Sequence, residues 1–231
     1  MFRQVGVSYC SLVDDGLPAS QGTPIATASG LLRGLLTGER LALNFLMHLS
    51  GIATHTARTV QEAGSLRVVD TRKTTPLLRS LEKAAVVHGG GHNHRFGLYD
   101  AVLIKDNHIS AAGGLVAAIR QARCSDADIR IQIEVETLNQ LREAIEAGAD
   151  EVLLDNMDND TLRAAVALAR GRVLLEASGN MNAARIGQLR DIGLDRVSMG
   201  GLIHQSRWVD LSMKMEEASV LPLGQAQSDT P

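Results

Sequence analysis

The sequence has few aromatic residues, only two cysteines and no excess of basic charge. Phe, Trp and Tyr make up 3% of its 231 residues, so the core must be built from Leu, Val, Ile and Ala. The net charge of −3 argues against nucleic acid as the main partner, because proteins that bind it carry a broad basic surface. No apolar run approaches the roughly 18 residues of a transmembrane helix, and the start lacks a signal-peptide core. We therefore expect a cytoplasmic protein without a membrane partner.

The two cysteines, Cys10 and Cys124, lie far apart and belong to no metal-binding or redox motif. We expect both to be buried free thiols in a reducing compartment. A hydrophobic fraction of 45% and a charged fraction of 21% are typical of a globular protein with an ample core.

What the sequence does contain is one stretch, residues 70–108, that is rich in histidine and in cations. It holds four of the seven histidines and six of the 23 Lys and Arg residues. Four of these cations are packed against apolar runs or glycines, namely Arg72, Lys73, Arg95 and Lys105. Arg offers a planar fork, and Lys a point charge, to carboxylate or phosphate groups. Solvated surface charge is the alternative, but the apolar neighbours favour a site for a polyanionic small molecule.

A strand–helix alternation begins after residue 65. Strands are expected at 66–70, 101–105, 129–136, 151–155, 172–176 and 195–199. Helices are expected at about 76–85, 114–123, 137–148, 160–170, 182–191 and 208–217. The first of these helices should have Thr75 as its N-cap and Pro76 at its first position. Short units of this kind impose a parallel sheet.

The residues before this alternation are harder to interpret. Short strands at 5–9 and 22–28 cannot bury a core alone, so this part should pack on the main body or on a neighbouring subunit. A helical pattern runs from Glu39 to Glu62, with a kink or break expected at Ser50-Gly51. We therefore predict an N-terminal unit at 1–38, a main domain at 39–223 and a polar, disordered tail at 224–231.

Polar residues follow all six expected strands. An open α/β sheet gathers its site at one switch point, whereas an α/β barrel draws functional residues from the ends of many strands. The predicted fold class is therefore α/β, with an incomplete parallel barrel of about six strands.

Acidic and glycine-containing strand ends complete the expected site. Glu134 and Glu136 are two residues apart in a strand and point to one side, and Asp155 ends the next strand. These oxygens could hold Mg²⁺, or they could be ion-pair partners of the cations, and both interpretations stay open. Glu176, at the end of the following strand, is a further candidate for this acidic group. The turns at 178–180 and 200–201 each open onto a helix, where backbone N–H groups favour phosphate.

Three long motifs carry a family resemblance. DTRKTTP at 70–76, GGGHNHRFGLYD at 89–100 and LIKDNH at 103–108 resemble the quinolinate phosphoribosyltransferases, in order and in spacing. The resemblance covers residues 35–215. Leu77 is one departure, because the family usually has glycine after the proline of KTTP. The other is a shortened N-terminal domain, which makes residues 1–38 resemble a remnant of the family's sandwich domain.

The resemblance implies transfer of phosphoribose from phosphoribosyl pyrophosphate to quinolinate, giving nicotinate mononucleotide, pyrophosphate and CO₂. It also implies a homodimer in which Arg40 of the partner subunit enters the site. Quinolinate would be held by Arg72, Arg95, Lys105 and that Arg40, with His94 as a donor. Lys73 and Mg²⁺ would offset charge on the pyrophosphate, while Glu134 and Asp155 would lie near the developing cation or bind the metal. The remaining expected substrate-binding residues are Thr71, Ser178, Gly179, Asn180, Ser198 and Gly200.

Three other hypotheses compete with this functional assignment. A paralogue of the same fold, associated with molybdate transport, tends to depart from the HR and LIKDNH pattern, which this chain keeps whole. A truncated, non-catalytic family member acting as a binding partner is supported only by the short N-terminus and by Leu77. A sugar-phosphate isomerase on a barrel would account for the phosphate turns but not for the cations.

Overall fold

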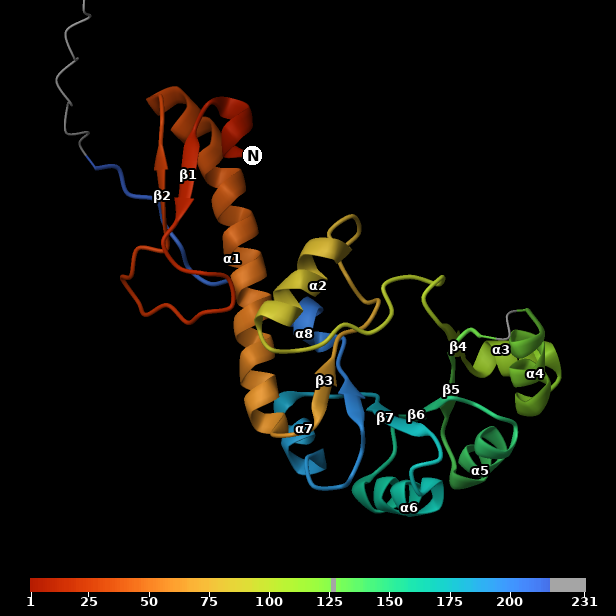
Figure 1. Ribbon diagram of the computed structural model, residues 1–231. Coiled ribbons are helices and arrows are strands. Elements are labelled where there is room, and N and C mark those ends of the chain that lie inside the picture. Colours follow the sequence, from red (N-terminus) through yellow and green to blue (C-terminus); the bar gives the residue numbers. More distant parts are fainter. Residues whose placement is uncertain (126–127, 217–231) are drawn as a thin grey trace, which may run out of the picture.

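The computed structural model describes residues 1–125 and 128–216, which form a small N-terminal unit and an α/β barrel (Figure 1). The N-terminal unit contains η1 (Phe2–Val5), β1 (Ser8–Ser11) and β2 (Ala26–Ser29). A long helix, α1 (Leu32–Ala63), runs from this unit down the side of the barrel. In the described residues, no helix is long and apolar enough to cross a membrane.

After α1, strands and helices alternate along the chain, except that α4 directly follows α3. They are β3 (Arg67–Val69), α2 (Arg79–His88), β4 (Val102–Ile104), α3 (Asp106–Ala112), α4 (Leu115–Ser125), β5 (Ile131–Val135), α5 (Leu138–Glu146), β6 (Glu151–Asp155), α6 (Asn159–Ala169), β7 (Leu174–Ser178), α7 (Ala183–Leu189), β8 (Arg196–Ser198) and α8 (Gly201–His204). All six strands expected in the barrel are present, with small shifts at their ends.

Six parallel strands form the barrel, in the order β3-β8-β7-β6-β5-β4. The two outer strands, β3 and β4, do not pair with each other, and the sheet curves around an interior that is open on that side (Figure 1). Residue 92 makes a parallel bridge to Val69, so the segment after α2 adds to the free edge of β3. The prediction of an incomplete barrel of six strands is confirmed.

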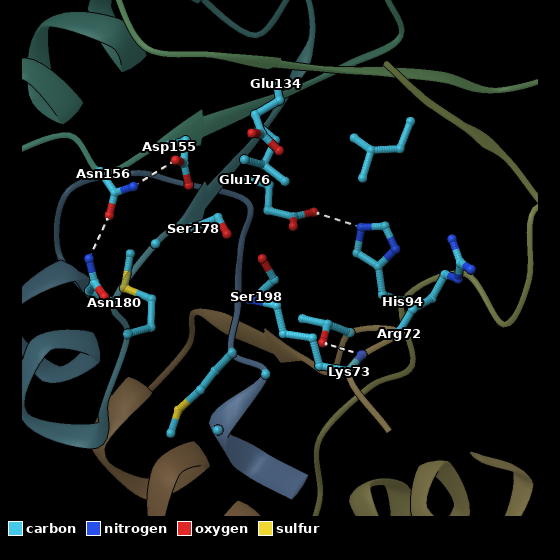
Figure 2. A pocket seen from close by; sticks show the side chains of 18 of the residues that line it. Arg72, Lys73, His94, Glu134, Asp155, Asn156, Glu176, Ser178, Asn180 and Ser198 are labelled. Atoms are coloured by element: carbon cyan, nitrogen blue, oxygen red, sulfur yellow. Dashed lines mark hydrogen bonds and ion pairs between the residues drawn. The ribbon is translucent and has the colours of Figure 1, made fainter. Parts of the chain in front are cut away.

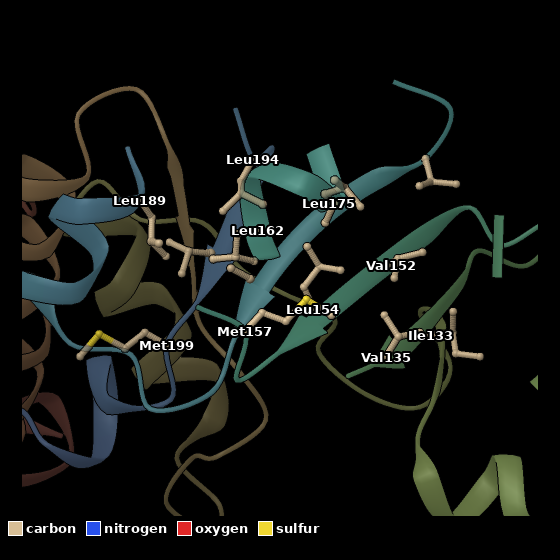
Figure 3. Close-up of a cluster of buried hydrophobic side chains, with 14 of the residues drawn as sticks. Ile133, Val135, Val152, Leu154, Met157, Leu162, Leu175, Leu189, Leu194 and Met199 are labelled. Atoms are coloured by element: carbon tan, nitrogen blue, oxygen red, sulfur yellow. The ribbon is translucent and has the colours of Figure 1, made fainter. Parts of the chain in front are cut away.

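Alternation along β5 shows how the sequence builds this sheet. Ile131, Ile133 and Val135 are fully buried and belong to the apolar cluster between the sheet and its helices (Figure 3). The residues between them, Gln132 and Glu134, point to the other side, because successive strand residues face opposite ways. The barrel interior is therefore polar at this strand, while aliphatic side chains hold the helices on the outside.

Helix ends follow the expected chemistry at two positions. Thr137 accepts a hydrogen bond from the N–H of Gln140 and forms a capping box at the start of α5. Asn182 accepts one from the N–H of Arg185 at the start of α7. Both side chains thereby accept hydrogen bonds from N–H groups that have no partner within the first helical turn.

A kink or a break is predicted at Ser50-Gly51, and the break is wrong, because α1 is continuous over 32 residues. Gly51 is needed for close packing instead, since a Cβ there would lie 2.2 Å from the carbonyl oxygen of Arg207. The N–H of Val209 also donates to the carbonyl of Met47. Segment 206–210 thus lies directly on α1. The boundary predicted at residue 38 stays a prediction and falls within this helix.

Four further expectations need correction. The helix expected at 208–217 is not helical at 208–216, and residue 217 and the predicted tail lie outside the described residues. Helix α2 begins at Arg79, three residues after Pro76, because Leu77 adopts a left-handed conformation with φ 68°. Thr75 is therefore not its cap. The strand expected at 5–9 begins only at Ser8, and the two free cysteines are exposed rather than buried.

Candidate active site

A cavity of about 610 Å³ lies at the carboxyl ends of the barrel strands (Figure 2). Its walls bring together most of the residues that the sequence predicts for substrate, catalysis or metal. They include Thr71, Arg72, Lys73, His94, Arg95, Lys105, Glu134, Asp155, Ser178, Gly179, Asn180, Ser198 and Gly200. Two predicted residues, Glu136 and Arg40, do not line this cavity of their own chain, and Arg40 is exposed on α1.

The loop after β3 presents Thr71, Arg72 and Lys73 to the cavity and is held by a set of hydrogen bonds. The N–H of Lys73 donates to Oγ1 of Thr71 at 3.0 Å. The N–H of Thr75 donates to Oε2 of the buried Glu82 at 2.8 Å, and His48 on α1 contacts the other oxygen of that carboxylate at 2.8 Å. The loop that follows the three-residue strand β3 is thus held in place by α1 and α2.

A buried ion pair fixes the segment that carries His94 and Arg95. Asp70 and Lys83 are almost completely buried and contact each other directly. Oδ1 of Asp70 also accepts from the N–H of His94 at 2.9 Å, and Nζ of Lys83 donates to the carbonyl of His94 at 3.0 Å. Burial raises the pKa of Asp70, although Lys83 acts in the opposite direction. Both charges are therefore used to hold the main chain at His94.

The ring of His94 is enclosed on both sides. Nδ1 accepts from the N–H of Arg95 at 2.8 Å, and Nε2 lies 3.3 Å from Oε2 of Glu176 (Figure 2). Glu176 is fully buried on β7 and also contacts Arg196 and Gln132, at 2.5 and 2.9 Å. Burial raises the pKa of Glu176, but the hydrogen bond from His94 and the charge of Arg196 outweigh it and lower the pKa to about 2. This carboxylate is ionised at any physiological pH.

Arg72, Arg95 and Lys105 line the same cavity, with Arg72 and His94 on the side opposite Asp155 and Asn180 (Figure 2). Nη1 of Arg95 donates to the carbonyl of Ala101 at 2.9 Å. Burial, and then the charge of Arg72, lower the pKa of Arg95. Lys105 directly contacts Glu134, whose side chain is 18% exposed. Several cations that line one cavity are suited to a dianion.

The other side of the cavity contains oxygens, amides and turns. Oδ2 of Asp155 accepts from the side chain of Asn156 at 2.6 Å, and Asn156 in turn accepts from the amide of Asn180 at 3.0 Å. Asn156 and Asn180 both have positive φ, at 53° and 49°. Gly179 has no room for a Cβ, which would lie 2.2 Å from Oδ1 of Asn156. The turn after β7 is thus folded against the end of β6.

Two groups of residues are placed differently from what the sequence alone indicates. Glu136 lies outside the cavity, because β5 ends at Val135. Within the described residues, no group of three or more His, Cys, Asp or Glu side chains could hold a metal ion by itself. Glu134 and Asp155, two of the predicted metal ligands, both line the cavity.

Sequence reasoning missed part of the lining. The additional residues are Leu103, Leu153, Asn156, Met181, Met199, His204 and Gln205, whereas Gly201 belongs to a predicted phosphate turn and Glu176 is a predicted candidate acid. Asn156 directly follows a strand-end acid, which was a usable signal. His204 is the last residue of the short helix α8, whose four residues carry no periodic pattern.

Fold and cavity together define a class of protein. An α/β barrel with a cation cluster and a group of acids and turns at its carboxyl ends is an enzyme domain for small anionic substrates. Comparison with known sequences identifies the family. The profile described as "Quinolinate phosphoribosyl transferase, C-terminal domain" matches residues 52–214, and its N-terminal counterpart matches residues 1–50. The chain belongs to the quinolinate phosphoribosyl transferase family.

Relatives and solved structures agree with this assignment. A probable nicotinate-nucleotide pyrophosphorylase (carboxylating) of Bacillus subtilis is 44% identical over 202 residues, covering 86% of this chain and 70% of that protein. A Synechocystis protein of the same name is 44% identical over 210 residues, covering 88% of this chain and 71% of that protein. The crystal structure of NadC from Streptococcus pyogenes has a TM-score of 0.89 at 43% identity, covering 93% of this chain and 78% of that one.

Proposed function

We propose that the protein transfers phosphoribose from phosphoribosyl pyrophosphate to quinolinate and removes one carboxylate, giving nicotinate mononucleotide, pyrophosphate and CO₂. This is a step of NAD biosynthesis and makes the protein a pentosyltransferase. The observation that carries the proposal is one cavity with two sides of different chemistry. Arg72 and His94 lie on one side and Asp155, Asn156 and Asn180 on the other (Figure 2), while Lys105 lines the same cavity in contact with Glu134.

Quinolinate would bind on the side of the cavity that carries Arg72. Arg72 and Arg95 provide planar donors that match carboxylates, and Lys105 adds a point charge. Lys105 already contacts Glu134, so a substrate carboxylate would share this cation with a protein carboxylate. Holding the pyridine ring in this way brings its nitrogen towards the ribosyl carbon, and orientation of this kind removes much of the entropic barrier.

The phosphoribosyl group would bind on the other side. Transfer passes through an oxocarbenium-like state, as in glycoside chemistry, so Glu134 and Asp155 are suited to face the developing positive charge. Lys73 and the turns at 178–180 and 198–201 would receive the phosphate and pyrophosphate oxygens. After transfer, the quaternised ring nitrogen stabilises the electron pair left on the neighbouring carbon when CO₂ departs. The residues then mainly orient the ring and exclude water.

A bound Mg²⁺ fits this donor set only together with substrate. Glu134 and Asp155 provide two carboxylates, and Mg²⁺ commonly uses one or two of these with substrate phosphates completing its shell. Such an ion would neutralise charge on the departing pyrophosphate. Removing divalent ions with a chelator should abolish turnover, and Mg²⁺ should restore it. Full activity in metal-free buffer would show that Glu134 and Asp155 are ion-pair partners of the cations and do not bind a metal.

The test of the main proposal is a direct assay. The purified protein is mixed with phosphoribosyl pyrophosphate, Mg²⁺ and carboxyl-labelled quinolinate, and released CO₂ and nicotinate mononucleotide are measured. Arg95→Ala or Lys105→Ala should reduce turnover about a hundredfold, as expected for one preorganised charge contact. The exposed His88 lies outside the cavity, so His88→Asn should match wild type. Product from nicotinate but none from quinolinate would refute the assignment.

We further propose a homodimer with composite sites, in the cytoplasm. Arg40 is exposed and does not line its own cavity, and five exposed leucines of the N-terminal part favour an interface: Leu12, Leu17, Leu31, Leu32 and Leu36. The two free thiols are compatible with a reducing compartment. A two-fold interface could place Arg40 of the partner subunit in each site.

Complementation tests the composite site. Arg40→Ala and Lys105→Ala proteins are unfolded, mixed and refolded together. In a mixed dimer, one site receives both lesions and the other receives none. About a quarter of wild-type activity should return, since half of the randomly paired dimers are mixed and each has one intact site. No recovery, with dimers verified by sizing, would show that Arg40 does not act across subunits.

A further inference from the structure

We propose that His94 is a positioning residue whose Nδ1 fixes the main chain of Arg95, and that Glu176 sets the ring tautomer on which this contact depends. The inference rests on the proposed function and assigns to His94 a role other than that of a substrate donor.

All four polar groups of His94 have protein partners. Its N–H donates to Asp70 and its carbonyl accepts from Lys83, at 2.9 and 3.0 Å. Its Nδ1 accepts from the N–H of Arg95 at 2.8 Å, and its Nε2 lies 3.3 Å from Glu176 (Figure 2). The side chain is 12% exposed, and those of Asp70, Lys83 and Glu176 are 1% exposed or less. Such contacts gain strength from the low dielectric around them.

These contacts determine where the ring proton lies. A backbone N–H can only donate, so Nδ1 must present a lone pair to Arg95. A neutral ring then carries its proton on Nε2, and this N–H faces a carboxylate, which can only accept. Glu176 stays ionised because Arg196 and Gln132 donate to it at 2.5 and 2.9 Å. In this arrangement the ring has no N–H available for a substrate.

The effect of His94 therefore passes through Arg95. The ring holds the main-chain N–H of Arg95, and the carbonyl of Ala101 holds its guanidinium group at 2.9 Å. Arg95 lies in the segment between α2 and β4, which spans the open side of the barrel (Figure 1). The pairs of His94 with Asp70 after β3 and with Glu176 on β7 anchor this segment from two strands. The Arg95 side chain is thereby held in a fixed orientation before a substrate binds.

Two amide variants of His94 distinguish positioning from direct donation. In His94→Asn, the amide oxygen can occupy the place of Nδ1 and accept from Arg95. In His94→Gln, the longer side chain reaches towards Glu176 but leaves the Nδ1 position empty. We expect KM for quinolinate within about threefold of wild type in His94→Asn and about tenfold higher in His94→Gln, with KM for phosphoribosyl pyrophosphate unchanged in both. His88→Asn serves as the matched control, and thermal melting checks that both variants fold.

The opposite order, with Gln retaining function and Asn losing it, would overturn the proposal in favour of direct donation from Nε2. An equal loss in both variants would also overturn it. Nitrogen-15 NMR of the protein labelled at histidine gives a readout that needs no turnover. Here we expect a pyridine-type Nδ1 and a protonated Nε2 for His94, and a protonated Nδ1 would refute the tautomer. Wild-type protein inactive with quinolinate but showing this spectrum would refute the proposed function alone.

Discussion

Leu77 provides a sharp test of the link between sequence and backbone conformation. Its φ of 68° lies in the left-handed region, and its side chain is completely exposed. A left-handed conformation costs a residue with a Cβ roughly 1–2 kcal/mol, whereas glycine adopts it freely. Glycine also loses about 0.5–1 kcal/mol more chain entropy on folding. Leu77→Gly should therefore stabilise the protein by about 0.5–1 kcal/mol, which is roughly 1–4 °C in Tm for a chain of this size.

Two companion variants separate strain from side-chain burial. Leu77→Ala keeps the Cβ and removes only exposed atoms, so its stability should match wild type within about 0.5 kcal/mol. Arg170 is also left-handed, with φ 49° at the end of α6, and Arg170→Gly should shift stability in the same direction as Leu77→Gly. Urea unfolding at one fixed protein concentration measures all three. A clear loss of stability in both Leu77 variants would refute the reasoning and show that this side chain is buried in the assembled protein.

Three further predictions concern buried groups. Lys83→Met should cost about 3–5 kcal/mol because it leaves the Asp70 charge unpaired, and Lys83→Met with Asp70→Asn should cost clearly less, as urea unfolding would show. The pKa of Glu176 falls from 4.5 to about 2 on folding, so its contribution of roughly 3 kcal/mol is complete above pH 4.5 and is lost as the pH falls towards 2. The stability difference between wild type and Glu176→Gln should accordingly shrink between pH 5 and pH 3, and a constant difference would contradict the assigned pKa. Gly51→Ala should lower stability by about 1–3 kcal/mol, because its Cβ would meet the carbonyl of Arg207, and an unchanged Tm would show that segment 206–210 does not need this contact.

The barrel could be predicted because its signals are local and repeated. Each strand is a short apolar run that ends in polar residues, and caps such as Thr137 and Asn182 mark where helices begin. Periodicity identifies elements of this kind when they are long enough. Helices α3 and α8, with seven and four residues, are too short to show it and were missed.

Two positions, Gly51 inside α1 and Leu77 before α2, show where local sequence signals mislead. Gly51 resembled a helix breaker, but its role depends on a backbone that approaches from 156 positions later in the chain, at Arg207. No sequence feature near residue 51 predicts that contact. Leu77 shows the converse, since only the family resemblance indicated that glycine is usual there.

The candidate site was predictable in its membership but not in its pairings. Chemistry at the strand ends indicated Arg72, Lys105 and Asp155, because parallel strands bring their carboxyl ends together. The contact between His94 and Glu176 depends on a distance across the barrel, which spacing along the chain does not encode. The burial of Lys83 has no signal in the sequence, because buried lysines are rare.

The order of the strands also determines when the site can form during synthesis. Among the strands of the described residues, β3 neighbours only β8, so Arg67 meets Arg196 after almost the whole barrel has left the ribosome. Strands β4 to β8 can pair with their neighbours as they emerge, whereas β3 must wait for the last strand. Closing so long a loop is entropically costly, and contacts between distant residues slow folding. The cations after β3 therefore join the acids after β5 and β6 in the final stage of folding, so a nascent chain that ends before β8 has no complete site.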